Sequence, residues 1–112
     1  MQPIDVDALR VMLTSERRPT VINTLAPENF AQTRIPDSIN IPQDQDDFAE
    51  RVKEAAGGLE KPVVVYCASE QCQSSAKAAE KLDEAGFTEV YDFEGGAKAW
   101  REAGESLESS SA

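Results

Sequence analysis

The apolar residues of this chain fall into short runs separated by amphipathic stretches. The run Val63-Val64-Val65-Tyr66 is continuous, which is typical of a strand buried on both faces of a sheet. Residues 20–25 are rich in β-branched side chains and predict a second buried strand, and residues 89–93 alternate as a third strand would. Shorter strands are expected near Ile4 and within residues 35–42, where the prolines exclude a helix.

Helices are expected between these strands, because apolar residues recur there at helical spacing. The expected helical segments are 5–16, a short turn around 28–31, and the helices 46–56, 75–85 and 97–103. Asp5 is expected to cap the first helix, and Asp47 and Arg51 are spaced to form an ion pair along the third. Gly86 should end the helix 75–85 as its C-terminal cap.

This alternation of strands and helices predicts an α/β fold with a mostly parallel sheet covered by helices on both faces. The strand ending at Cys67 is expected at the centre of the sheet. Ligands of such sheets bind outside the carboxyl ends of the strands, where Cys67 would then lie. We expect residues 1–104 to form a single domain, followed by a Ser-rich, flexible C-terminal tail at 105–112.

The charge balance narrows the range of partners. The chain of 112 residues has 11 Lys and Arg against 21 Asp and Glu, a net charge of −10 at pH 7. Such a surface repels phosphate backbones and anionic lipid, so neither nucleic acid nor a membrane is expected as a partner. No apolar run reaches the ~20 residues of a membrane helix, and residues 1–5 lack the features of a signal peptide. With no disulfide framework of the secreted kind, we expect a cytoplasmic protein. We also expect a monomer.

The chain contains no histidine, which excludes several mechanisms. A Cys-His pair, a Ser-His-Asp triad and a histidine-ligated metal are all ruled out. Two cysteines alone do not complete a structural zinc site, so neither a metal nor another cofactor is expected. A paired-carboxylate mechanism at Asp92 and Glu94 has no further support in the sequence. Activation of Cys67 must therefore come from the backbone, a helix dipole or a neighbouring cation.

Cys67 is the leading candidate for chemistry, because it ends a buried strand and opens a polar loop before an Ala-rich helix. Backbone N–H groups of the loop and of the helix N-terminus are expected to favour its thiolate, which is the nucleophile in cysteine chemistry. The alternative is an inert cysteine at the end of a buried strand. The loop residues expected around the sulfur, as a substrate- or anion-binding loop, are Ala68, Ser69, Glu70, Gln71, Cys72, Gln73, Ser74 and Ser75.

Cys72 lies in the same loop and allows two interpretations. It is either a resolving thiol that forms a disulfide with Cys67, or a loop residue without a chemical role. Ser74 or Ser75 is expected to act as the N-cap of the following helix.

From about Ile4 to Gly104 the chain resembles the rhodanese family of sulfurtransferase domains. The similar segments are 63–82, 86–87, 90–96, 99–100 and 35–42, the last being close to Ile-Pro-Gly-Ala-Ile-Asn-Ile-Pro with Asp37 and Ser38 substituted. The resemblance implies a three-layer sandwich with a five-stranded, mainly parallel sheet. It also implies that Cys67 is an active-site cysteine that carries sulfur as a persulfide.

The chain also departs from the family's common loop, Cys-x-x-Gly-x-Arg-Ser. It has two additional loop residues, Ser74 stands where the family usually places Arg, and Glu70 adds a negative charge. Asn23 and Leu25 stand where many members have Asp and Arg. An Arg would hold thiosulfate through bidentate, charge-assisted hydrogen bonds. We therefore expect a persulfide rather than thiosulfate as the sulfur donor.

Three functions follow in order of preference. The first is a sulfurtransferase in which Cys67 accepts sulfane sulfur and passes it to a thiol or another nucleophile, on a small molecule or a protein. The second is a non-catalytic regulatory module that uses Cys67 and Cys72 as a redox switch. The third is phosphatase- or arsenate-reductase-like chemistry, which wants an Arg in the loop, and none lies between Cys67 and Ser75.

Overall fold

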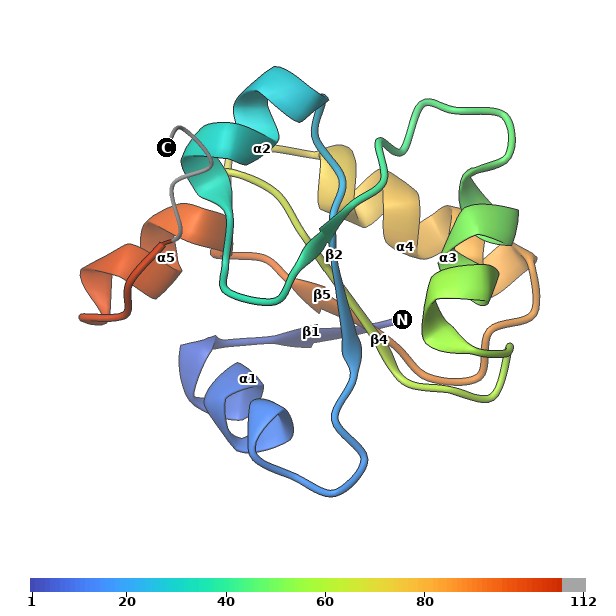
Figure 1. The fold of residues 1–112 in the computed structure, drawn as a ribbon, viewed down its shortest axis with the longest axis horizontal. Helices are drawn as coiled ribbons and strands as arrows, with labels where there is room; N and C mark the ends of the chain where they lie inside the picture. The colour runs from blue at the N-terminus through green and yellow to red at the C-terminus, as the bar shows by residue number, and fades with distance from the viewer. Residues whose placement is uncertain (108–112) are drawn as a thin grey trace.

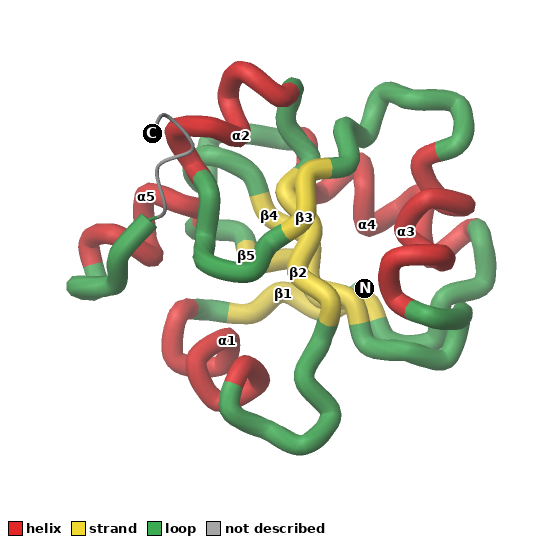
Figure 2. The backbone as a smooth tube through the Cα atoms, viewed as in Figure 1, coloured by secondary structure: helices red, strands yellow, loops and turns green. Residues whose placement is uncertain are grey.

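A computed structural model describes residues 1–107 of the chain. One sheet contains the strands β1 (Gln2–Ile4), β2 (Thr20–Asn23), β3 (Ile39–Asn40), β4 (Val63–Tyr66) and β5 (Val90–Phe93). Its strand order is β1-β5-β4-β2-β3, and each of these pairings is parallel. Figure 2 shows the strands in yellow, crossing the middle of the molecule. The prediction that the strand before Cys67 is central is confirmed.

The helices cover both faces of this sheet. They are α1 (Val6–Leu13), α2 (Pro27–Thr33), α3 (Phe48–Ala56), α4 (Ser74–Glu84) and α5 (Gly96–Glu102). Figure 1 shows α1 and α5 on one side of the sheet and α3 and α4 on the other. The predicted α/β sandwich with five strands is therefore confirmed. Within residues 1–107, no helix combines the length and the apolar character that crossing a membrane requires.

The central strand explains why the two apolar clusters are separate. All four residues of β4 are fully buried, and successive side chains point to opposite faces. Val63 and Val65 pack with the apolar side chains of α3 and α4, whereas Val64 and Tyr66 pack with those of α1 and α5. The second cluster includes the buried Trp100, which meets Phe93 edge to face at 6.5 Å between ring centroids. This burial on both faces fixes the strand that leads to Cys67.

Three of the local helix signals act as predicted. The Asp5 carboxylate caps α1 by accepting the backbone N–H of Ala8 at 2.9 Å. Arg51 and Asp47 form the expected ion pair along α3, with Nε and Oδ2 3.0 Å apart. Gly86 follows α4 with a φ of +99°, a left-handed conformation that favours glycine.

Part of the predicted C-terminal tail lies against the domain. The carbonyl of Ser106 accepts a hydrogen bond from the Trp100 indole at 3.1 Å, and Glu105 accepts one from Arg10 at 2.8 Å. Leu107 packs against the apolar cluster that contains Trp100. The rest of the predicted tail, residues 108–112, lies outside the described residues.

Candidate active site

The residue before Cys67 fastens the end of the central strand to a neighbouring turn. The buried Tyr66 hydroxyl donates to the carbonyl of Thr33 at 2.9 Å and accepts the N–H of Ile35 at 3.0 Å. It also shares a hydrogen bond of 2.9 Å with the Ser38 hydroxyl. These contacts connect the strand end to the turn at 33–38, so Cys67 leaves the sheet from a fixed point.

The first residues of α5 hold the backbone where the loop begins. The N–H of Ala97 donates to the carbonyl of Cys67, and the N–H of Lys98 donates to the carbonyl of Ala68, both at 2.9 Å. Gly96 allows this approach, since its φ is +63° and a Cβ atom there would collide with the Cys67 carbonyl oxygen. The start of the loop is therefore held by backbone from another element.

Cys67 is only 1% exposed, and hydrogen-bond acceptors surround its sulfur. The thiol faces the Cys72 carbonyl at 3.4 Å, the Ser75 hydroxyl at 3.7 Å and the Ser69 carbonyl at 3.8 Å. Burial and a hydrogen bond with the Cys72 thiol raise the pKa of Cys67 to about 11, although the backbone and hydroxyl of Ser75 act in the opposite direction. Cys67 is therefore protonated at neutral pH in this arrangement.

The expectation that main-chain amides stabilise a Cys67 thiolate is wrong for this arrangement of the loop. Two of the three acceptors around its sulfur are carbonyl oxygens, which favour the neutral S–H, and among the main-chain groups only the Ser75 N–H lowers its pKa. The surroundings of the sulfur are nevertheless polar and not hydrocarbon alone.

Cys72 is the more acidic thiol of the pair. Its burial raises its pKa, but hydrogen bonds from the Cys67 thiol, from the backbone of Ser74 and Ala68, and from the Ser74 hydroxyl outweigh that effect and lower it. Cys72 is half-buried, and neither cysteine is in a disulfide. The anion that the sequence predicted for this loop is therefore favoured at Cys72.

The remaining loop residues divide into an outer and an inner group. Glu70, Gln71 and Gln73 are exposed, whereas Ala68, Ser69 and Ser74 are half-buried and Ser75 is buried. The loop turns where the Cys72 N–H donates to the Ser69 carbonyl at 3.1 Å.

The expectation that Ser74 or Ser75 caps α4 is wrong. Gln73 occupies the N-cap position without a side-chain hydrogen bond. The hydroxyl of Ser75 faces the thiol of Cys67, and that of Ser74 interacts with Cys72, so neither is used as a cap.

A small cavity opens beside Cys72 and has a strongly acidic lining. Its volume is about 110 Å³, and its lining residues are Glu70, Cys72, Gln73, Ser75, Ala76, Asp92 and Glu94. Three of these residues carry carboxylates and none is a cation. An anion entering this cavity would meet like charge.

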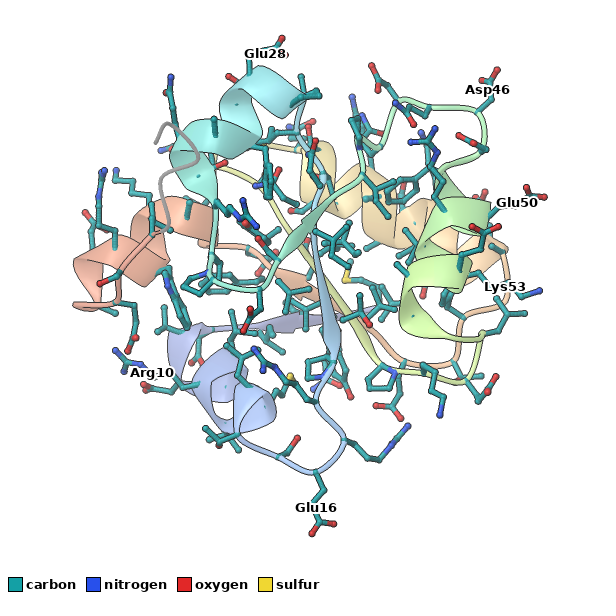
Figure 3. The ribbon with its side chains drawn as sticks, viewed as in Figure 1. Arg10, Glu16, Glu28, Asp46, Glu50 and Lys53 are labelled. Atoms are coloured by element: carbon teal, nitrogen blue, oxygen red, sulfur yellow. The ribbon has the colours of Figure 1, made fainter. Side chains whose placement is uncertain are left out.

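Asp92 lines the acidic cavity, a role that was not predicted for it. It is 2% exposed at the end of β5, and its Oδ1 has no hydrogen-bond partner. Burial raises the pKa of this carboxyl, the Ser75 side chain lowers it, and the charge of Glu94 raises it. By contrast, Glu16, Glu28, Asp46 and Glu50 project from the surface in Figure 3. The signal was a charged residue between Tyr91 and Phe93, inside an apolar strand.

Positive charge near the loop lies in a separate groove. That groove has a volume of about 330 Å³ and contains two cations, its lining residues being Gln32, Thr33, Ala68, Ser69, Ala97, Lys98, Arg101 and Leu107. It shares no lining residue with the acidic cavity. Among residues 1–107, no three His, Cys, Asp or Glu side chains are grouped so that they would hold a metal ion.

Comparison with known proteins defines the family. The sequence profile described as the rhodanese-like domain matches residues 5–103, so the chain belongs to the rhodanese-like family. The predicted family resemblance is confirmed. The thiosulfate sulfurtransferase GlpE of Pseudomonas syringae pv. syringae (strain B728a) is 34% identical over 99 residues, which is 88% of this chain and 83% of that protein.

Solved structures agree with this assignment. The BH2092 protein of Bacillus halodurans superposes with a TM-score of 0.80 at 26% identity, covering 96% of this chain and 77% of that one. A rhodanese-related protein of Thermoplasma volcanium gives a TM-score of 0.75 at 28% identity, covering 96% of this chain and 98% of that one.

Proposed function

We propose that this protein is a rhodanese-type sulfurtransferase in which Cys67 carries sulfane sulfur as a persulfide and passes it to a thiol or another nucleophile. The observation that carries the proposal is the position of Cys67. It follows the carboxyl end of the central strand, and its thiol is hydrogen-bonded to the Ser75 hydroxyl at the start of α4. A relative named thiosulfate sulfurtransferase supports sulfur transfer as the general class of activity.

The hydrogen bond between the two thiols provides a route for activation. The lowered pKa of Cys72 favours its thiolate, and in that form Cys72 accepts the Cys67 proton and leaves Cys67 as the thiolate. That thiolate attacks the outer sulfur of a donor R–S–SH, the donor's S–S bond breaks, and R–S⁻ leaves and takes up the proton from Cys72. The product Cys67–S–SH then gives its outer sulfur to an acceptor thiolate by the same exchange. No oxidant is required in either step.

The charges around the loop favour a persulfide over thiosulfate as the donor. Thiosulfate carries two negative charges, and the cavity beside Cys72 supplies three carboxylates and no cation. A small persulfide carries at most one negative charge on its sulfur atoms, and it is neutral in the protonated form that the thiolate attacks. The same lack of a cation argues against phosphatase- or arsenate-reductase-like chemistry, because those reactions stabilise a tetrahedral oxyanion.

Mass spectrometry of the intact protein and of its peptides tests this function. After exposure to a small-molecule persulfide, the peptide containing Cys67 is expected to gain the mass of one sulfur atom, and Cys67→Ser should gain none there. Thiosulfate is expected to load the protein far more slowly. If neither donor adds sulfur to Cys67, the proposed function is wrong.

A redox switch is the second candidate, and the contact between the two thiols favours it. The Cys72 thiolate is oxidised by a peroxide to a sulfenic acid, and the Cys67 thiol then displaces water to form the disulfide. The reduction potential of the Cys67–Cys72 pair discriminates between the two functions. A disulfide that glutathione reduces readily supports the switch, whereas a pair that never oxidises excludes it.

A further inference from the structure

The acidic cavity has a feature that its charge alone does not explain. Asp92 is almost completely buried and is one of the residues that line the cavity. The Ser75 side chain interacts with its carboxyl, but Oδ1 has no hydrogen-bond partner. Buried acceptors in folded proteins are nearly always satisfied, so an unsatisfied oxygen on a residue that lines a cavity points to a ligand that donates a hydrogen bond. The group that fits best is a cation, because it also offsets the charges of Glu70 and Glu94.

The position of Cys72 indicates which chemical group the ligand carries at its other end. Its thiol lines the same cavity as Asp92, and it is hydrogen-bonded to the thiol of Cys67. A molecule bound to Asp92 would therefore extend toward the pair of cysteines, where sulfur exchange takes place. A thiol or persulfide that also carries a protonated amine satisfies both ends of the cavity.

The size of the cavity limits this ligand to a small molecule. Its volume of about 110 Å³ is that of roughly four water molecules in the liquid. Cysteamine, with an ammonium group and a thiol on adjacent carbons, has this size. Anionic thiols of the same length would place a carboxylate against three others.

We propose that the cavity between Asp92 and Cys72 binds the ammonium group of a small aminothiol, and that this aminothiol is the sulfur acceptor. The inference rests on the proposed sulfurtransferase function and specifies its substrate class. In the transfer, the aminothiol's thiolate attacks the outer sulfur of Cys67–S–SH, the S–S bond breaks, and Cys67 leaves as a thiolate while the aminothiol becomes a persulfide.

The test uses protein loaded with sulfur at Cys67 and three acceptors in which the same two-methylene spacer joins the thiol to the second group. These are cysteamine, 2-mercaptoethanol and 3-mercaptopropionate, which are cationic, neutral and anionic at pH 7. Rates of sulfur removal are compared per thiolate, because the three thiols differ in acidity. Cysteamine is expected to react roughly tenfold faster than 2-mercaptoethanol, and 3-mercaptopropionate slowest.

Charge variants assign the effect to the cavity. Asp92→Asn keeps the size of the side chain and is expected to remove most of the preference for cysteamine. Glu16→Gln is the matched control, since it removes one negative charge in the turn after α1, at the end of the molecule opposite Glu28 (Figure 3). The preference for cysteamine should persist in Glu16→Gln. Circular dichroism verifies that each variant is folded.

The outcomes separate this inference from the proposed function. Equal rates for the three acceptors, or an unchanged preference in Asp92→Asn, would overturn the aminothiol site while sulfur transfer stands. If Asp92→Asn does not fold, Glu94→Gln takes its place, and a preference undiminished there overturns the proposal. Failure of Cys67 to take up sulfur from any donor rejects the proposed function instead.

Discussion

Cys67 and Cys72 belong to one loop, yet their surroundings favour opposite protonation states. Cys67 is covered and faces carbonyl oxygens, which keep its proton in place. Cys72 is half-buried and receives hydrogen bonds from backbone N–H groups and from the other thiol, so its anion is favoured. The comparison teaches that position at the end of a strand does not by itself make a cysteine acidic. Burial of each sulfur and its hydrogen-bond partners decide its pKa.

The largest expected effect comes from removing each sulfur in turn. Cys67→Ser should lower the rate of sulfur transfer by more than roughly 1,000-fold, because the sulfur carrier is lost. Cys72→Ser should lower it by about 100-fold, because only the proton acceptor is lost. Stopped-flow measurement of persulfide consumption checks both values. Equal losses in the two variants would contradict the division of roles between carrier and base.

Alkylation should separate the two thiols by pH. At pH 7, iodoacetamide is expected to modify Cys72 more than roughly 100-fold faster than Cys67, because only thiolates react. The Cys67 rate should then rise with increasing pH until its pKa of about 11, since deprotonation increases up to that point. Peptide mass spectrometry after timed quenching gives both rates. Faster modification of Cys67 at neutral pH would reverse the comparison.

Gly96→Ala should lower the stability of the protein, because it introduces a clash at the Cys67 end of the loop. The added Cβ collides with the Cys67 carbonyl at a positive φ, so the free energy of unfolding should fall by about 2–4 kcal/mol. Gly57→Ala is the control, because it has a similar φ of +93° and no atom within 4 Å. That control should lose only about 1–2 kcal/mol. Urea denaturation measures both, and equal losses would mean that the contact with Cys67 is unimportant.

The two serines at the start of α4 form a matched pair for the thiols. Ser75→Ala removes a hydroxyl that lowers the pKa of Cys67, so that pKa should rise further and sulfur loading should slow roughly fivefold to tenfold. Ser74→Ala should instead raise the pKa of Cys72. Alkylation rates against pH give both values. A shift of the same thiol in both variants would contradict the assignment of one serine to each cysteine.

The smallest expected effect is that of Asp37→Gly, which should change the stability of the protein without changing the chemistry of either thiol. Asp37 has a φ of +67°, a left-handed conformation that favours glycine. Asp37→Gly should raise the free energy of unfolding by up to about 1 kcal/mol, because glycine adopts a positive φ without strain. The ion pair with Arg18 that is lost is exposed and contributes little. The pKa values of both cysteines should stay unchanged. Thermal unfolding checks the first expectation, and a lower stability would show that the ion pair outweighs the backbone strain.

Sequence patterns predicted the features that depend on neighbouring residues in the chain. The continuous apolar run at 63–66 identified the central strand, and Gly86 identified the end of α4. The protonation state of Cys67 was not predictable in this way, because it depends on how deeply the folded loop buries the sulfur and on which groups then face it. For the same reason, the sequence did not show that the Ser75 hydroxyl would face the Cys67 thiol and that Gln73 would occupy the N-cap of α4. Asp92 gained its significance only from the cavity that the loop and β5 enclose together.

The two backbone hydrogen bonds from α5 restrain only one part of the loop. They hold Cys67 and Ala68 in place, while Glu70, Gln71 and Gln73 are exposed to solvent. Since Cys67 is covered, we expect residues 69–73 to move before a substrate contacts its sulfur, while the hydrogen bonds from α5 hold Cys67 and Ala68 in place.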